Sequence, residues 1–158
     1  MKRPPLIPVI IGTGFGAGFW PWGPGTAGAV LATVIWLALS SVMGQMALIA
    51  VTAALIVVFT ILGTWATARL EPFWGEDPSR IVADEMVGVW IPLLLASEWK
   101  TALAALLLFR FFDILKPLGI RKLDERPGAF WVMGDDIAAG IYSAIVLGAA
   151  LGVAHYLN

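Results

Sequence analysis

The sequence contains no cysteine, a single histidine, and no Asp, Glu, Lys or Arg between Arg3 and Arg69. Without cysteine the chain forms no disulfide and performs no thiol catalysis. A soluble domain carries roughly 25% charged residues, whereas this chain carries 13% and is 59% hydrophobic. Because no water-soluble surface can be built from the charge-free stretch, the sequence predicts an integral membrane protein. The formal net charge of −1 gives no general attraction to nucleic acid.

Five apolar segments predict an all-α membrane bundle of about five helices, forming a single domain over residues 1–158. The segments are 27–43, 46–68, 81–97, 101–116 and 137–157. Segments 46–68 and 137–157 match the ~20 residues that cross a hydrocarbon core. Segments 81–97 and 101–116 are short, so tilted or interfacial helices are expected there. Asp77 and Pro78 are typical of a helix start, with Asp as N-cap and Pro at the first helical position.

The distribution of positive charge predicts the orientation of the bundle. Lys2 and Arg3 favour a cytoplasmic N-terminus. Threading five helices from that side leaves only Lys100 in the outer loops and places the other loop cations in the cytoplasm: Arg69, Arg80, Arg121, Lys122 and Arg126. The same threading puts the acidic residues and the glycine-rich stretch 12–28 on the cytoplasmic side.

The glycine-rich stretch, GTGFGAGFWPWGPGTAG, has the composition of a nucleotide-binding turn. A dinucleotide fingerprint requires an acidic residue about 20 residues on, but none follows until Glu71. The Gly-Lys-Ser/Thr of a phosphate-binding loop is also absent, so no nucleotide is expected. Two interpretations remain: a loop that lets backbone approach the bundle closely, or one whose N–H groups, with Gly25 and the Thr26 hydroxyl, bind a phosphate. Thr26 is equally an ordinary N-cap.

Five carboxylates lie at the predicted cytoplasmic ends of three helices: Asp84, Glu85, Asp113, Asp135 and Asp136. Carboxylates at membrane depth carry a large free-energy cost and are usually functional. Gly88 and Gly140 follow Asp84 and Asp136 at i+4, and small residues let membrane helices approach closely. The acids are therefore expected to meet, and converging carboxylates repel unless a cation lies among them. Oxygen-only ligands suit Mg²⁺, or Mn²⁺ or Ca²⁺.

Simpler interpretations stay open for parts of this pattern. Arg110, Asp113 and Lys116 fall on one helix stripe, as a salt-bridged face at the water boundary does. Asp135 and Asp136 at a helix start would suit the helix dipole. Taken together, however, acids for a metal beside cations for a phosphate are typical of a phosphoryl-transfer site. At a membrane surface, the natural substrate of such a site is a lipid phosphate.

The residues that are missing limit the phosphatase chemistry. A histidine nucleophile is excluded because the only histidine, His155, is predicted near the far end of the last helix. No Asp-x-Asp motif supports an aspartyl-phosphate mechanism. Attack by metal-activated water remains, with a carboxylate as general base. A covalent carboxylate intermediate outside those motifs is left open.

Three blocks of the sequence resemble those of the phosphatidylglycerophosphatase A family: GFGAG with PWGPGTAG, RIVADEMVGVWIP, and FRFFDILKPLGIRKLDERPGAFWVMGDDIAAG. The resemblance implies a multi-pass, Mg²⁺-dependent enzyme of the bacterial inner membrane with its site facing the cytoplasm. Its substrate would be phosphatidylglycerophosphate, and its products phosphatidylglycerol and phosphate. The implied catalytic residues are Asp84, Glu85, Asp113 and Asp136, and the implied metal ligands are these four and Asp135. The implied phosphate contacts are Arg110, Lys116, Thr26 and Gly25.

Two rival functions make different demands on the same residues. A small non-enzymatic transporter or ion-conduit subunit would distribute charge through the membrane thickness, whereas the charges here cluster on one side. A phosphotransferase of the CDP-alcohol kind requires the pattern D-x-x-D-G-x-x-A-R, which is absent. Neither the oligomeric state nor the number of metal ions follows from the sequence.

Overall fold

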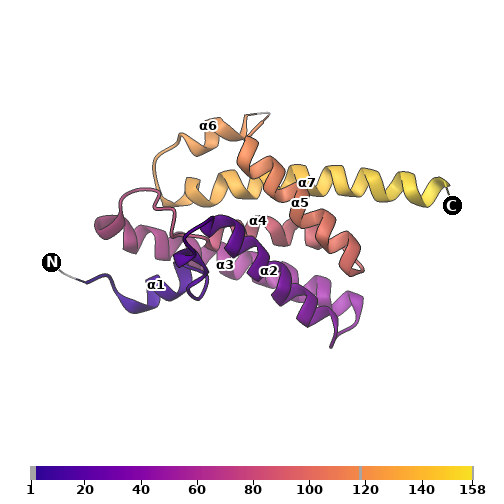
Figure 1. The fold of residues 1–158 in the computed structure, drawn as a ribbon, viewed down its shortest axis with the longest axis horizontal. Coiled ribbons are helices and arrows are strands. Elements are labelled where there is room, and N and C mark those ends of the chain that lie inside the picture. Colours follow the sequence, from indigo (N-terminus) through magenta and orange to yellow (C-terminus); the bar gives the residue numbers. More distant parts are fainter. Residues whose placement is uncertain (1–2, 118, 158) are drawn as a thin grey trace.

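The computed structural model describes residues 3–117 and 119–157, and these residues form helices without any strand among them (Figure 1). In chain order the elements are α1 (Leu6–Gly12), the 3-10 helix η1 (Ala17–Phe19), α2 (Pro24–Ser40), α3 (Gln45–Trp74), α4 (Ala83–Leu93), α5 (Trp99–Leu115), α6 (Ile120–Asp124) and α7 (Ala129–Leu157). The all-α prediction is confirmed. Lys2, on which the predicted orientation partly depends, lies outside the described residues.

Among the described residues, two helices, α3 and α7, are long and apolar enough to cross a membrane. They have 30 and 29 residues, and the mean hydropathy of their most apolar stretches is 2.6 and 2.1. Large apolar side chains on both face outward, among them Val57 and Ile61 on α3 and Ile145 and Val153 on α7. Outward apolar faces of this extent are expected of helices in lipid and not of helices in water.

The centre of the bundle is α4, which packs against α2, α3, α5 and α7 (Figure 1). Nine of its eleven residues are buried, and its indole at Trp90 donates a 3.1 Å hydrogen bond to the carbonyl oxygen of Ala32 in α2. The ring of Trp90 also lies edge-on to Phe59 of α3, with centroids 5.1 Å apart. At eleven residues α4 is too short to span a bilayer, so its neighbours, and not lipid, cover it.

The close approach of α4 and α7 depends on two glycines. A Cβ on Gly88 would overlap the ring of Phe109 and lie 2.8 Å from the carbonyl oxygen of Asp136, and a Cβ on Gly140 would overlap the carbonyl oxygen of Gly88. The expected small-residue contact is therefore confirmed. Because Asp84 and Asp136 precede these glycines by about one turn, the contact brings the two carboxylates to the same end of the bundle.

The bundle has two chemically different ends. At one end the α2–α3 turn meets the α4–α5 turn, where the Gln45 side chain donates a 2.9 Å hydrogen bond to the carbonyl oxygen of Ala96. At the other, which we call the acidic end, α4 and α7 begin and α5 finishes. His155 lies in the last turn of α7, about 29 Å from Asp136 along the helix axis at 1.5 Å per residue.

The start predicted for the helix in segment 81–97, which corresponds to α4, is wrong. Asp77 and Pro78 lie in a turn, and α4 begins at Ala83 with Val82 as an N-cap that makes no side-chain cap bond. Val82 is held there by its N–H, which donates a 2.8 Å hydrogen bond to the carbonyl oxygen of Gly12. Thr26 is likewise not the N-cap of α2, because Gly23 takes that position and Pro24 is the first helical residue.

The last helix begins eight residues earlier than the predicted 137–157. Gly128, with φ of 108°, ends the preceding loop, and the bulky apolar residues after it already pack as the first turns of α7. Asp135 and Asp136 are therefore in the second turn of the helix and do not open it. The short helices α1 and α6 were not predicted. Pro8 does not prevent α1, because it lies in the first turn of that helix, where proline is tolerated.

Candidate functional site

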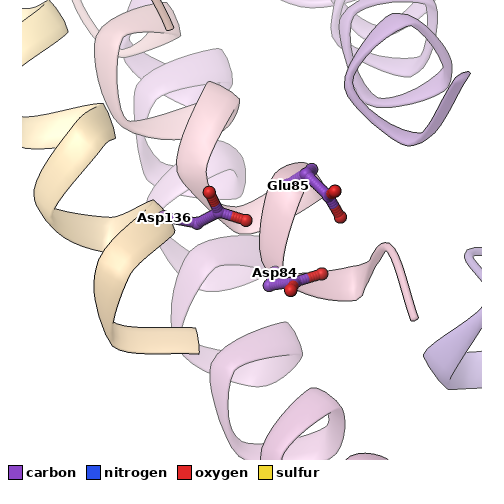
Figure 2. A group of neighbouring side chains, drawn as sticks. All are labelled: Asp84, Glu85 and Asp136. Carbon is purple, nitrogen blue, oxygen red and sulfur yellow. The ribbon is translucent and has the colours of Figure 1, made fainter. Parts of the chain in front are cut away.

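Carboxylates from three helices meet at the acidic end. The ligand oxygens of Asp84, Glu85 and Asp136 all lie within 4.8 Å of one another, and the same holds for Asp113, Asp135 and Asp136. Asp136 belongs to both groups, and Figure 2 shows it reaching from α7 toward the start of α4. The prediction that these distant acids gather in one place is confirmed.

These carboxylates are buried without enough partners. The exposed fractions of Asp84, Asp113, Asp135 and Asp136 are 7%, 9%, 5% and 3%. One oxygen each of Asp84, Glu85 and Asp136 is buried and accepts no hydrogen bond. Buried ionised oxygens are strongly destabilising unless they are paired or coordinate a metal. Oxygen ligands alone, at this spacing, fit a hard divalent cation of the Mg²⁺ or Ca²⁺ type.

Arg110 and Lys116 provide positive charge beside different carboxylates of the cluster. Arg110 forms an ion pair with Asp113 one turn later on α5, and its Nε is buried without a partner. The Lys116 Nζ lies 2.7 Å from an Asp135 oxygen and 2.5 Å from an Asp124 oxygen. Two cations do not balance the five carboxylates of the cluster, which again leaves room for a metal ion.

Lys116 leaves the helical stripe in which the spacing placed it. It is the C-cap of α5 in the left-handed conformation, with φ of 45° and ψ of 50°, and the Pro117 that follows cannot continue the helix. Burial disfavours its charged form, but hydrogen bonds and charge from Asp124 and Asp135 outweigh this effect and raise the pKa of Lys116 above its ordinary value. Lys116 therefore stays protonated at neutral pH.

The cluster borders a cavity of about 190 Å³, which we call the acidic pocket. Its lining residues are Asp77, Ser79, Ile81, Asp84, Glu85, Asp113, Lys116, Val132, Asp135 and Asp136. Asp77 and Ser79 were missed as site residues because the Asp-Pro pair matched a helix start. The sequence did offer one indication: Asp77 is a further carboxylate only seven residues before Asp84. The turn that contains it directly precedes α4 and lines the pocket.

The glycine-rich stretch packs around the beginning of α4. A Cβ on Gly18 would overlap the carbonyl of Arg80, and one on Gly28 would lie 2.7 Å from the Cβ of Val82. A Cβ on Gly25 would overlap the Glu85 carboxylate and lie 3.3 Å from Arg110 Nη1. The close-packing interpretation is confirmed, and it sets the first turn of α2 directly against the site.

The two residues of this stretch that were predicted to bind phosphate lie differently. Gly25 borders Glu85 and Arg110. Thr26 is exposed and lines a separate apolar hollow beside Trp20 and Trp22. Phosphate binding by either residue stays a prediction, and the geometry favours Gly25 as the nearer one.

The chain is similar to three named bacterial proteins along most of its length. A Bacteroides thetaiotaomicron protein, provisionally named a phosphatidylinositol-3-phosphatase, is 55% identical over 95% of this chain and 97% of its own length. Proteins named phosphatidylglycerophosphatase A from Haemophilus influenzae and Escherichia coli are 38% and 32% identical, each over 87% of this chain and over 85% and 80% of their lengths. No solved structure matches.

The family model of phosphatidylglycerophosphatase A matches residues 10–151, which include every residue of the acidic cluster. This match covers far more than half of the chain and agrees with the names of two of the relatives. It also decides against the transporter and conduit interpretation. The chain therefore belongs to the phosphatidylglycerophosphatase A family and is an enzyme, a lipid phosphatase.

Proposed function

We propose that this enzyme hydrolyses phosphatidylglycerophosphate to phosphatidylglycerol and inorganic phosphate with the help of Mg²⁺. The family and the names of the Haemophilus and Escherichia relatives support this substrate. The observation that carries the chemistry is the meeting of five carboxylates with Arg110 and Lys116 at one pocket. This arrangement combines ligands for a hard cation with donors for a phosphate.

The candidate metal ligands in this proposal are drawn from the five clustered acids: Asp84, Glu85, Asp113, Asp135 and Asp136. Their unpartnered buried oxygens are the reason to expect an ion there. Bound Mg²⁺ supplies a Lewis acid that neutralises phosphate charge and acidifies water. Mg²⁺ is usually held by only one or two carboxylates in addition to waters and phosphate, so the set is large enough to leave one carboxylate free as a base.

The protein's own groups bind and orient the substrate. Arg110 and Lys116 donate to the phosphate oxygens, and the absence of a side chain at Gly25 lets the Glu85 carboxylate and Arg110 lie directly against the first turn of α2. A water oxygen attacks phosphorus while a pocket carboxylate accepts the proton of that water. The bond from phosphorus to the ester oxygen then breaks, and the leaving oxygen takes up a proton. Positioning and charge stabilisation of this kind account for most of the rate enhancement in phosphoryl transfer.

A second substrate follows from the Bacteroides relative, whose name assigns it to phosphatidylinositol 3-phosphate. Both lipids present a phosphate monoester near the membrane surface, so the same acidic pocket serves either. Purified enzyme is therefore assayed for phosphate release with both lipids in the same detergent micelles. Preference for phosphatidylglycerophosphate, loss of activity in EDTA and recovery with Mg²⁺ are the expected results. Full activity in EDTA, or activity on the inositol lipid alone, would contradict the proposal.

We further propose that the acidic end faces the cytoplasm of a bacterial inner membrane. The support is charge: Arg69, Arg80, Arg121, Lys122 and Arg126 lie toward the acidic end, against Lys100 at the other. Since the chain has no cysteine, a single introduced cysteine shows which side of the membrane its residue faces, without labelling of any other thiol in the protein. Lys100→Cys is expected to react with an impermeant maleimide in intact spheroplasts, and Arg121→Cys only after permeabilisation. The reverse pattern would overturn the orientation.

A further inference from the structure

Two apolar hollows lie along the outer face of α2. One, of about 440 Å³, is lined by Trp20, Trp22, Gly23, Thr26, Ala27, Val30, Leu31 and Val34. The other, of about 230 Å³, is lined by Val30, Thr33, Val34, Leu37, Trp99, Leu103 and Leu106. Because Val30 and Val34 line both, the two hollows adjoin along α2, and together we call them the α2 groove.

The α2 groove has the length and the ends expected for a hydrocarbon chain. From Gly23 to Leu37 it follows α2 for about 21 Å at 1.5 Å per residue, which exceeds half of a ~30 Å hydrocarbon core. Trp20 and Trp22 stand at one end and Trp99 at the other, and tryptophan is enriched where membrane meets water. The hydroxyl of Thr33, which lies on the buried side of the groove, donates a 2.9 Å hydrogen bond to the carbonyl oxygen of Ala29 and so presents no free donor there.

One end of the groove adjoins the active site. Gly23 and Thr26 line the groove, while Gly25, between them in the same turn of α2, borders Glu85 and Arg110. A single helical turn thus separates an apolar channel from the carboxylate cluster. A ligand that matches both sides of this turn has a long hydrocarbon tail joined to a phosphate.

We propose that the α2 groove binds an acyl chain of the phospholipid substrate while its phosphate lies in the acidic pocket. This inference rests on the proposed lipid phosphatase reaction and adds a subsite to it. The groove holds the chain beside the first turn of α2, so chain binding fixes the position of the headgroup over the carboxylates. Binding energy from a remote part of the substrate is then used to orient the reacting group.

A kinetic test uses the matched variants Val34→Trp and Val57→Trp. The two valines are similarly exposed, at 53% and 58%, but Val34 lines the groove and Val57 lies on the outer face of α3. Each variant is assayed with the same headgroup on dipalmitoyl and dihexanoyl lipid. Filling the groove is expected to raise the ratio of long-chain to short-chain KM about fivefold, whereas Val57→Trp leaves that ratio unchanged. An equal ratio in both variants would overturn the subsite.

A second test does not depend on turnover or on any variant. Wild-type protein is irradiated with a lipid that carries a diazirine in its acyl chain and a non-hydrolysable phosphonate in place of the phosphate. Labelling is expected to concentrate on the peptide that contains α2, and phosphatidylcholine with the same chain is expected to label α2 and α3 alike. Identical labelling by both lipids would mean that bulk lipid covers the groove. Failure of the phosphatase assay with correct α2 labelling would instead count against the proposed reaction.

Discussion

The two ends of the bundle differ in whether their polar groups have hydrogen-bond partners. At the α4–α5 turn, Glu98 and Thr101 form a reciprocal capping box, and Gln45 caps Ala96. At the acidic end, Asp84, Glu85 and Asp136 keep buried oxygens without partners. Polar groups at helix ends in apolar surroundings can form hydrogen bonds with nearby side chains. The helical fold therefore does not by itself require carboxylates without partners. They are a feature of the end where we propose that the metal ion and the phosphate bind.

The largest difference in activity between the two ends is expected for Asp136→Asn. Asp136 is the one acid shared by both carboxylate groups, so its neutralisation removes an ionised ligand from each without changing its volume. Phosphate release is expected to fall about a hundredfold or more. The matched change at the other end, Glu98→Gln, is expected to stay within about twofold. Similar losses in both variants, with both proteins folded by circular dichroism, would show that the two ends do not differ in function.

A smaller loss is expected on the cationic side of the cluster. Lys116→Gln removes the ion pairs with Asp124 and Asp135 and the proposed donor to phosphate, and kcat/KM is expected to fall about tenfold. Lys122→Gln, on the exposed surface of α6, serves as control. Steady-state phosphate release measures both, and equal kinetics in the two variants would remove Lys116 from the site.

The junction that creates the acidic end is tested by Gly140→Ala against Gly152→Ala. Both glycines lie in α7, but a Cβ on Gly140 would overlap the carbonyl oxygen of Gly88, while nothing lies within 4 Å of a Cβ on Gly152. Gly140→Ala is expected to destabilise the protein by about 1–3 kcal/mol. Gly152→Ala is expected to be neutral or to stabilise by about 0.5–1 kcal/mol. Thermal unfolding in one detergent measures both, and equal melting temperatures would contradict the close contact.

The smallest effect concerns the turn that the sequence did not assign to the site. Asp77→Asn is expected to change KM about two- to threefold with little change in kcat, because Asp77 lines the acidic pocket but belongs to neither carboxylate group. Glu71→Gln, in the last turns of α3, is the control. A loss of kcat as large as that of Asp136→Asn would move Asp77 into the catalytic set.

The features of the fold and site that could be predicted are those that composition or residue spacing indicates directly. Absence of charge predicted the apolar helices, and the i+4 spacing from Asp84 to Gly88 and from Asp136 to Gly140 predicted that two helices would meet. The parts that it missed depend on tertiary contacts. Nothing local shows that the N–H of Val82 bonds to Gly12 and so delays the start of α4. Nor does any local pattern fold the turn at Asp77 over the pocket.

We propose that acids from α4, α5 and α7 together hold a divalent cation. Calorimetric titration of purified, EDTA-treated protein with Mg²⁺ tests it most directly, with Asp136→Asn and Glu98→Gln titrated in parallel. Saturable binding is expected for the wild type and for Glu98→Gln, and no binding is expected for Asp136→Asn. Equal binding by all three proteins, or wild-type protein that binds no Mg²⁺ and still releases phosphate in EDTA, would contradict it.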